Sequence, residues 1–491
     1  MEWIIKMPET IILNPDVKLI FDAINKKRKR YDLLYAYYEG RHPLRYSTDR
    51  LKKAFEKLDT YFAQNWISVI IESLTDKLIL KGFDVSDNEA ANTAIDDLYK
   101  LYDMQLLADD VHEAAIVTGE AFIIAMQSED GDSEEPLDIY FNDPRMCHVL
   151  YDFDRPGKKR VAGKMYIDEQ RFVCMVLYYE DKFLYYKTNQ RLKDKSETLP
   201  TWKPSLFLPD PDTPEEDNPF DEIPVFHFRS KRNSKKLDVG PSEVSLQDAI
   251  NKLLTDMLVS SEFNAFVQRV IISQADPGNL QNIAGANWWL PSGDSKGQQT
   301  SVQELGGRTL DGFLSAIDKM ATSLGIISRT PKHYFFAQGG DPSGEALIAM
   351  EAPLNKKASK RQKGFGVEWQ RLAKFLLNIS GNKDVKKSQI VPIWEPIETV
   401  QPLTAANIIK TETDAGIPLN TSARRRGWSN EEIKQMEDDK KKEKKEMAGL
   451  AQNALDELRA QDARNNATGQ LAGAAPANGR NNTSAQQGNG S

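Results

Sequence analysis

Apolar residues recur at helical spacing through the N-terminal part of the chain. Residues 14–39 carry them three and four positions apart, which predicts a helix that ends before Gly40 and Pro43. Residues 62–80 repeat this pattern and predict a long amphipathic helix. Residues 90–126 predict two further helices.

The spacing changes to a period of two between residues 137 and 186. The runs IYF, MCHVLYD, VAGKMYI, RFVCMVLYY and KFLYYKT are separated by Asp-Pro, Pro-Gly and charged turns. Alternation of this kind, interrupted by turn residues, predicts an antiparallel sheet. Residues 223–228 (IPVFHF) predict one more strand.

Two predicted helices then flank a segment of short strands. Residues 241–266 form the first helical pattern, with Pro241 at its start and Ser242 as a candidate N-cap. Residues 267–308 contain short strand-like runs between turns, and residues 309–324 form the second helical pattern. A small strand-containing excursion is therefore carried between two helices.

The C-terminal part is predominantly helical. Residues 345–379 predict one long helix in which Pro353 is expected to cause a kink or a break. Residues 403–415 and 429–461 predict further helices, whereas residues 464–491 have the composition of a disordered tail. Helices combined with a separate antiparallel sheet predict a fold of the α+β class.

Charge is unevenly distributed along the 491 residues. The chain holds 64 Lys and Arg against 72 Asp and Glu, a net charge of -8. Residues 84–154 contain 19 acidic and 2 basic residues, whereas residues 346–381 contain 7 basic and 2 acidic ones. Residues 208–222 contain seven acidic residues and four prolines, which predicts an exposed, extended loop. The acidic total argues against a protein that coats nucleic acid.

No segment has the pattern of a signal peptide or a membrane span, so we expect a protein that is neither secreted nor inserted in a membrane. The two cysteines, Cys147 and Cys174, form neither a disulfide framework nor a CxxC motif. This fits a reducing compartment.

Catalytic motifs are absent from the sequence. There is no phosphate-binding loop of the GxxxxGK[ST] type and no HExxH, and the five histidines are far apart. The string SGDSKG fits GxSxG around Ser295, but Pro291 precedes it and polar residues follow, which favours a loop over a nucleophile elbow. We therefore predict no catalytic, cofactor or metal site.

Several short strings resemble the portal proteins of tailed bacteriophages, in the same order along the chain. They are YYEGRHPL, with Tyr37, Tyr38, Gly40, His42 and Pro43; the helix 65–78 followed by Gly82 and Phe83; residues 119–122; Asp143-Pro144; IPVFHF; the helix around 246–257; and PSGEAL, with Pro342, Ser343 and Gly344. Each string is short, but their order and spacing across residues 30–380 carry the resemblance.

The resemblance implies a portal-type fold and a ring, usually of twelve subunits, at one vertex of the capsid. It implies these parts: wing, 1–240; stem helix, 241–266; small inserted α/β clip, 267–308; second stem helix, 309–328; tunnel loop, 329–343; long kinked helix returning to the wing, 344–400; crown helices, 401–463; and the tail, 464–491. It implies no enzymatic activity and no cofactor.

The resemblance also implies partners: double-stranded DNA passing through without sequence readout, the terminase large subunit, a head-tail adaptor, and the major capsid and scaffolding proteins. The ring would assemble in the host cytoplasm and remain in the virion. Twelve chains of charge -8 carry -96, which suits a conduit that must not grip DNA. The acidic block 84–154 and the basic block 346–381 are candidates for complementary faces of neighbouring subunits, the alternative for each block being an ordinary solvated face.

Candidate site residues follow from these parts. Arg329, Lys332, His333 and Gln338 belong to the tunnel loop; of these, Lys332 and Arg329 are candidates for transient contacts with the DNA backbone, the alternative being ordinary exposed charges. For the neighbouring aromatic residues 334–336 we expect packing between neighbouring loops and not stacking on bases, because a duplex hides its base faces.

Trp288 and Trp289 in the clip are candidates for binding partner proteins, the alternative being core packing. Two competing functions are an enzyme of DNA metabolism, such as a nuclease or packaging ATPase subunit, and a non-viral helical scaffold or adaptor protein.

Overall fold

The computed structural model describes most of the chain, with gaps: residues 14–42, 64–86, 88–128, 136–192, 207–231, 238–265, 268–272, 301–305, 309–335, 343–381, 389–398, 402–428 and 430–471. The chain forms two compact units, Met1–Gly427 and Trp428–Ser491. The first unit contains the sheets and the hydrophobic core.

Among the residues described, the first unit opens with the helices α1 (Pro15–Tyr38), α3 (Trp66–Thr75), α4 (Glu89–Leu101) and α5 (Met104–Thr118). Helix α1 confirms the helix predicted over residues 14–39. The second helix is shorter than the predicted 62–80, because Leu80 begins strand β1 (Leu80–Val85), which pairs with β13 (Ile390–Trp394).

The predicted helical stretch 90–126 is wrong at its C-terminal end. Gly119, at φ 98°, ends α5, and the next residues form strand β2 (Glu120–Gln127). This strand is central in a three-stranded antiparallel sheet, between β10 (Val225–Arg229) and β3 (Leu137–Asn142). Its first six residues are all buried, and such a continuous apolar run has no period that separates strand from helix.

The predicted antiparallel sheet is confirmed for all its runs but the first, since IYF lies in β3 of the three-stranded sheet. The strand order of the large sheet is β4-β5-β6-β7-β8, with β9 also paired to β7. The strands are β4 (Cys147–Tyr151), β5 (Lys159–Ile167), β6 (Phe172–Tyr178), β7 (Lys182–Arg191), β8 (Phe207–Pro209) and β9 (Glu215–Asp217). The acidic segment 208–222 is mostly exposed, as predicted, but it contributes β9 and part of β8 to this sheet.

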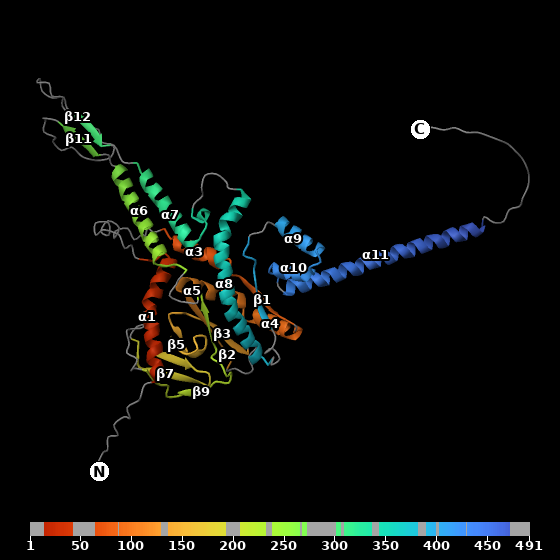
Figure 1. The fold of residues 1–491 in the computed structure, drawn as a ribbon, viewed down its shortest axis with the longest axis horizontal. Helices are drawn as coiled ribbons and strands as arrows, with labels where there is room; N and C mark the ends of the chain where they lie inside the picture. The colour runs from red at the N-terminus through yellow and green to blue at the C-terminus, as the bar shows by residue number, and fades with distance from the viewer. Residues whose placement is uncertain are drawn as a thin grey trace, which may run out of the picture. The chain divides into compact units, whose positions relative to one another are not determined.

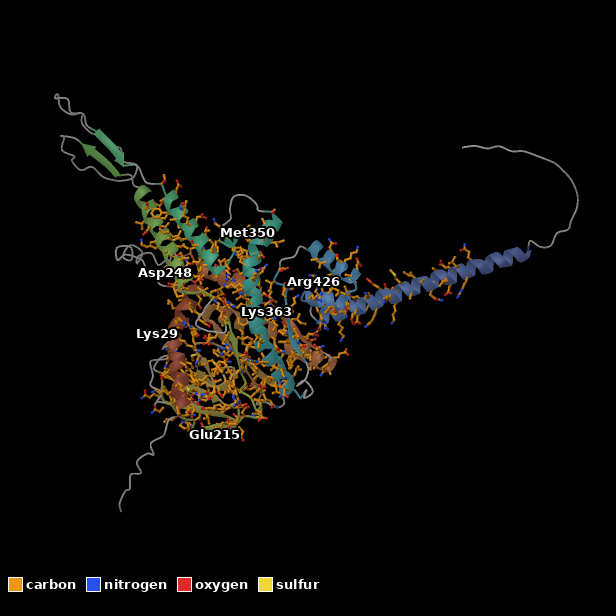
Figure 2. The ribbon with its side chains drawn as sticks, in the orientation of Figure 1. Lys29, Glu215, Asp248, Met350, Lys363 and Arg426 are labelled. Atoms are coloured by element: carbon orange, nitrogen blue, oxygen red, sulfur yellow. The ribbon has the colours of Figure 1, made fainter. Side chains whose placement is uncertain are left out.

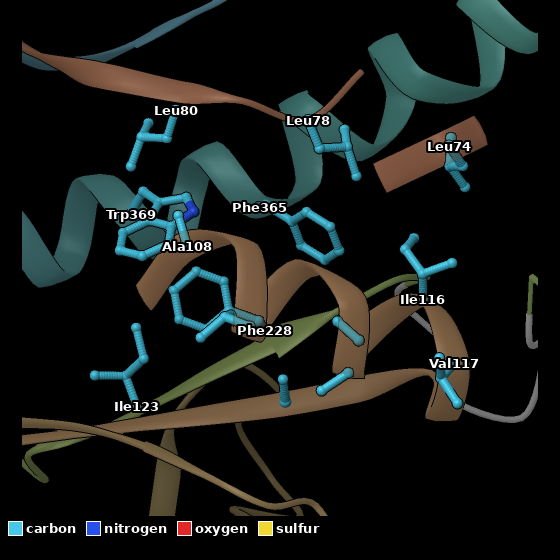
Figure 3. Close-up of a cluster of buried hydrophobic side chains, with 14 of the residues drawn as sticks. Leu74, Leu78, Leu80, Ala108, Ile116, Val117, Ile123, Phe228, Phe365 and Trp369 are labelled. Carbon is cyan, nitrogen blue, oxygen red and sulfur yellow. The ribbon is translucent and has the colours of Figure 1, made fainter. Parts of the chain in front are cut away.

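The largest core cluster joins the helices to the three-stranded sheet. Phe365 and Trp369 project from α8 (Gly344–Ile379) towards Phe228 of β10, with the Trp369 and Phe228 ring centroids 4.8 Å apart. Figure 3 shows these rings between α8, helix α5 and the strands, with Ile123 of β2 below them. The long helix is thus a core element.

Helix α8 runs without a break through Pro353, so the predicted break is wrong. Proline removes the hydrogen bond that would reach the carbonyl of Ala349. Ala349 and Pro353 are both exposed, so water can satisfy that carbonyl.

Helices α6 (Pro241–Ala265) and α7 (Asp311–Ser328) confirm the two predicted helices on either side of the strand segment. They lie side by side, and the antiparallel pair of β11 (Gln268–Ile272) and β12 (Ser301–Leu305) lies at their far end (Figure 1). The chain therefore leaves the sheets along one helix and returns along the other.

Three helices follow β13: α9 (Pro402–Asp414), α10 (Leu419–Arg425) and α11 (Asn430–Leu471). The sequence did not predict α10, which spans only two turns. Helix α11 continues to Leu471, past residue 464 where the disordered tail was predicted to begin; residues 472–491 lie outside the described part. Among the helices described, none is long and apolar enough to cross a bilayer.

Candidate functional site

The string YYEGRH lies at the end of helix α1, and two of its side chains form hydrogen bonds with helix α6. The Tyr37 hydroxyl donates a 2.7 Å hydrogen bond to Oδ1 of Asp248. The His42 ring stacks on the Tyr37 ring at 4.3 Å, and its Nε2 lies 2.9 Å from Nδ2 of Asn251, one turn further along α6. Burial lowers the pKa of His42, which keeps the ring neutral and lets it accept that hydrogen bond.

Gly40 makes the turn between Tyr38 and His42 possible. Its φ of 72° lies in the left-handed region, and the amide of Arg41 donates to the carbonyl of Ala36 at 2.8 Å, as in a Schellman cap. Nδ2 of Asn65 donates to the carbonyl of Tyr38 at 2.6 Å, which ties the start of α3 to the same turn.

A second set of hydrogen bonds joins α6 to the start of α3. Nε2 of Gln247 donates to the carbonyl of Gln64 at 2.6 Å, and its Oε1 accepts from the amide of Trp66 at 2.9 Å. Oδ1 of Asn251 accepts from the amide of Gln64 at 3.0 Å. We call these contacts among α1, α3 and α6 the stem joint. The motif residues of the joint hold the first stem-like helix in place.

Residues 329–335, the described part of the predicted tunnel loop, contact helices α7 and α8 of the same chain. Arg329 ends α7 at φ 63°, and the amide of Thr330 donates to the carbonyl of Gly325 at 3.0 Å. Nζ of Lys332 lies 3.2 Å from Oδ1 of Asp318 on α7, in a pair whose side chains are 28% and 50% exposed. Lys332 is therefore held by a partly solvated ion pair.

The aromatic residues after Lys332 pack within the same chain. The Tyr334 hydroxyl donates to Oε1 of Glu351 on α8 at 3.2 Å, and burial together with Glu351 raises the pKa of Tyr334 to about 12. The Phe335 and Trp66 ring centroids are 5.7 Å apart. Tyr334 and Phe335 therefore contact α8 and the start of α3 of the same chain, and packing between neighbouring loops stays a prediction. Nδ1 of His333 is buried and has no hydrogen-bond partner among the residues described.

The remaining predicted site residues divide into two groups. Ser343 caps α8, its Oγ accepting from the amide of Ala346 at 3.3 Å, and Gly344 is the first helical residue. The others lie outside the described residues: Pro43, Trp288, Trp289, Gln338 and Pro342. The structure thus assigns the second motif a helix-capping role.

The two charged blocks contain residues with internal roles that the sequence did not reveal. Glu120, in the acidic block, is buried on β2, where its Oε1 accepts from Lys27 Nζ at 2.5 Å and its Oε2 lies 2.9 Å from His227 Nε2. Burial opposes ionisation, but Lys27 and His227 outweigh it and hold the pKa of Glu120 well below its usual range. Arg361, in the basic block, pairs with Asp238 of the same chain.

Alternation and charge counting could not find these pairs, because both partners come from segments distant in sequence. One signal was available for Glu120, which stands inside the apolar run AAIVTGEAFIIAM. Within the described ranges, no group of three or more His, Cys, Asp or Glu residues could hold a metal ion, and Cys147 and Cys174 are both buried thiols.

Comparisons with known proteins relate most of the chain to one family. A family model described as "Phage portal protein, SPP1 Gp6-like" matches residues 17–446. The portal proteins of Mycobacterium phage D29 and Mycobacterium phage L5 are 25% and 24% identical to the chain over 157 residues, which are 30% of this chain and 32% of each relative. The match therefore spans about a third of those relatives.

A solved structure titled "Virion of native gene transfer agent (GTA) particle" covers 72% of this chain and 85% of its own, with a TM-score of 0.37 and 12% identity. The family model, in contrast, spans most of the 491 residues. The chain belongs to the SPP1 Gp6-like family of phage portal proteins.

Proposed function

We propose that the chain assembles into a ring at one vertex of a phage capsid and forms the conduit through which double-stranded DNA is packaged and ejected. Family membership supports this function. The single structural observation that supports it is the antiparallel pair α6 and α7, which carries β11 and β12 at its far end and leads directly into residues 329–335.

In this proposal α6 and α7 are the stem, residues 267–308 the clip, residues 329–343 the tunnel loop and α8 the long helix that returns to the wing. The wing is the α+β region up to residue 240, and the C-terminal helices are the crown. The stem joint then transmits load from the wing to the stem, since its hydrogen bonds cross from α1 and α3 to α6.

DNA contact in the channel is transient and independent of sequence. Arg329, Lys332, His333 and Gln338 belong to the tunnel loop that faces the DNA, and Lys332 and Arg329 contact the sugar-phosphate backbone. These contacts are transient, because tight phosphate binding would oppose translocation. The ion pair of Lys332 with Asp318 suits this role: a partly exposed pair contributes about 1 kcal/mol or less, so it opens easily.

Protein partners dock at the two ends of the ring. Trp288 and Trp289 in the clip bind the terminase large subunit during packaging and a head-tail adaptor afterwards, since aromatic side chains are common interface anchors. Capsid and scaffolding proteins surround the wing. The ring assembles in the cytoplasm of the bacterial host and has no enzymatic role of its own.

Negative-stain electron microscopy of the purified full-length chain tests this proposal. We expect turbine-shaped rings with an axial channel, in about twelve subunits as usual for rings of this kind. A monomer with nuclease or ATPase activity would instead support an enzyme of DNA metabolism. A chain that forms no closed ring in the presence or absence of scaffolding protein would overturn the proposal.

A further inference from the structure

A pocket of about 440 Å³ lies beside the start of α6, the end of α7 and the middle of α8. Its walls are strongly basic: five of the nine lining residues are cationic and two are acidic. The cationic residues are Lys231, Arg329, Lys357, Lys360 and Arg361. No motif in the sequence predicted this cluster, because its members come from three separate segments.

One carboxylate in the pocket wall faces three cations. Asp238 accepts from Nε of Arg361 at 2.9 Å and from Nη2 at 2.5 Å, a bidentate pair. Nζ of Lys357 and Nζ of Lys231 lie 3.8 Å and 3.7 Å from Oδ1 of the same carboxylate. Asp238 neutralises only one of these three charges.

The second acidic residue does not complete the neutralisation. Oε2 of Glu243 accepts a 2.9 Å hydrogen bond from the amide of Gly240, and its carboxylate contributes one negative charge to the pocket. Counting all seven charged residues, the pocket holds an excess of three positive charges. Burial lowers the pKa of Lys357 and of Lys231, the nearby Arg361 lowers both further, and Asp238 raises both. Lys357 also donates a 3.2 Å hydrogen bond to the carbonyl of Ser328 in the pocket wall.

Arg329 adds an independent observation. It is a non-glycine residue at φ 63°, the end position of α7 that usually favours glycine. An arginine there accepts an unfavourable backbone conformation and at the same time lines the pocket. Its guanidinium fork and the lysine ammonium groups are the donors that recognise phosphate oxygens.

We propose that this pocket binds a phosphate group, held by Arg329, Lys231 and Lys360 at its rim and attracted by the excess of positive charge in the pocket. Inorganic phosphate near neutral pH is largely a dianion and each phosphodiester of a nucleic acid is a monoanion, and both present several oxygens that accept hydrogen bonds from guanidinium and ammonium groups. The phosphate comes either from inorganic phosphate in solution or from a nucleic-acid backbone. The site does not depend on ring formation, so it extends the proposed function without resting on it.

Isothermal titration calorimetry of the full-length chain with inorganic phosphate, at an ionic strength held constant with chloride, tests the site. We expect saturable millimolar binding, about tenfold weaker in the double variant Lys231→Gln/Lys360→Gln, which removes two rim charges. Arg329→Gly removes the third donor and also suits the left-handed backbone, so we expect weaker binding without a lower melting temperature. Lys363→Gln is the matched control, because this exposed lysine of α8 (Figure 2) does not line the pocket.

Three results would overturn the proposal: no saturable heat with phosphate, unchanged affinity in the double variant, or an equal loss in Lys363→Gln. A short DNA duplex then separates the two sources. If the duplex competes with phosphate in the wild type and loses affinity in the double variant, the bound group belongs to nucleic acid; if it does not compete, the ligand is free phosphate. Because rings are scored by microscopy and the site by calorimetry, the two proposals fail separately.

Discussion

The Tyr37 hydroxyl donates a 2.7 Å hydrogen bond to Oδ1 of Asp248, and so links the last turn of α1 to the N-terminal half of α6. Both residues are buried, and they lie 211 positions apart in the sequence. Asp248 is labelled on α6 in Figure 2. A short string at the end of one helix therefore fixes the position of a distant one.

Tyr37→Phe tests the energetic weight of this link. The variant keeps the ring that stacks on His42 but removes the donor to a buried carboxylate. Hydrogen bonds to charged groups contribute about 1.5–3 kcal/mol, so we expect the free energy of unfolding to fall by that amount. Tyr38→Phe is the control: its hydroxyl donates to Glu113 at 2.9 Å in a partly exposed site, where water can replace it, and the loss should be about 1 kcal/mol or less. Urea denaturation measures both, and equal losses would contradict the special role of Tyr37.

Two glycine-to-alanine substitutions should act in opposite directions. Gly40→Ala forces a side chain into the left-handed region at φ 72° and brings its Cβ to 3.4 Å from Nδ2 of Asn65. We expect a loss of about 1–2 kcal/mol. Gly364→Ala lies inside α8, where the nearest atom to a new Cβ is the carbonyl oxygen of Arg229 at 3.9 Å, and it should stabilise the helix by about 0.5–1 kcal/mol. If both variants moved the unfolding midpoint the same way, the assignment of Gly40 as a conformational glycine would be wrong.

Periodicity predicted the elements that have one polar and one apolar face. It predicted α1 and α6, in which apolar residues recur at helical spacing. The strands of the large sheet were found as much by the turn residues between them, because β6 is buried at six of its seven positions and has no alternation of its own. Periodicity failed at β2, where burial on both faces erases the period. Of the kink or break expected at Pro353, the break is wrong, because the packing of a long helix outweighs the cost of a proline on its exposed side.

The site was harder to predict than the fold, because its contacts join distant segments. The string YYEGRH could be singled out, but its partners Asp248 and Asn251 look like ordinary polar residues of a helix. Asp238 precedes α6 in the polar stretch KKLDVG and carries no local sign of its pairing with Arg361. Charge counts assign such residues to surfaces, whereas tertiary structure buries them.

Removing the cation beside Glu120 should be strongly destabilising. Lys27→Met leaves a carboxylate that is 3% exposed with the Tyr31 hydroxyl and His227 but without its ammonium partner. Breaking a buried pair in this way costs about 3–5 kcal/mol. Lys29→Met, on the exposed side of the same helix (Figure 2), should stay within about 0.5 kcal/mol of wild type. Chemical denaturation of the two variants compares them directly. A small effect of Lys27→Met would show that Glu120 takes up a proton at little cost.

Acid should destabilise the chain partly through His112. Burial lowers the pKa of His112 from 6.5 to about 3, and its Nε2 accepts a 2.9 Å hydrogen bond from Nε1 of Trp369. The unfolded chain protonates this histidine below about pH 6.5 while the folded chain does not, so stability falls as pH decreases from 6.5 towards 3. Through His112 alone, the free energy of unfolding should change by up to about 1.4 kcal/mol per pH unit in this window.

His112→Gln isolates that contribution, because the glutamine oxygen can still accept from Trp369 but does not titrate. We expect the unfolding free energy of the variant to depend less on pH, by about 1.4 kcal/mol per unit in this window. The comparison uses the slope and not the absolute stability, so a general loss in the variant does not obscure it. Parallel slopes for the two proteins would exclude His112 as the source.

The ion pair between Lys332 and Asp318 allows the proposed DNA contact to be tested in both directions. Lys332→Ala removes the ammonium group, whereas Asp318→Asn leaves it in place and releases it from its carboxylate at 3.2 Å. If Lys332 touches the passing backbone, the first variant should reduce the length of DNA packaged per particle, and the second should retain it. The effect should be partial, because one transient contact per subunit adds a small electrostatic term.

Lys319→Ala is the control. It removes an exposed lysine of α7 next to Asp318, and so tests whether any loss of positive charge near the loop has the same effect. Pulsed-field electrophoresis of packaged DNA measures the outcome. Equal lengths for Lys332→Ala and wild type would remove Lys332 from the channel, and an equal defect in Asp318→Asn would mean that the pair acts by holding the loop and not by meeting DNA.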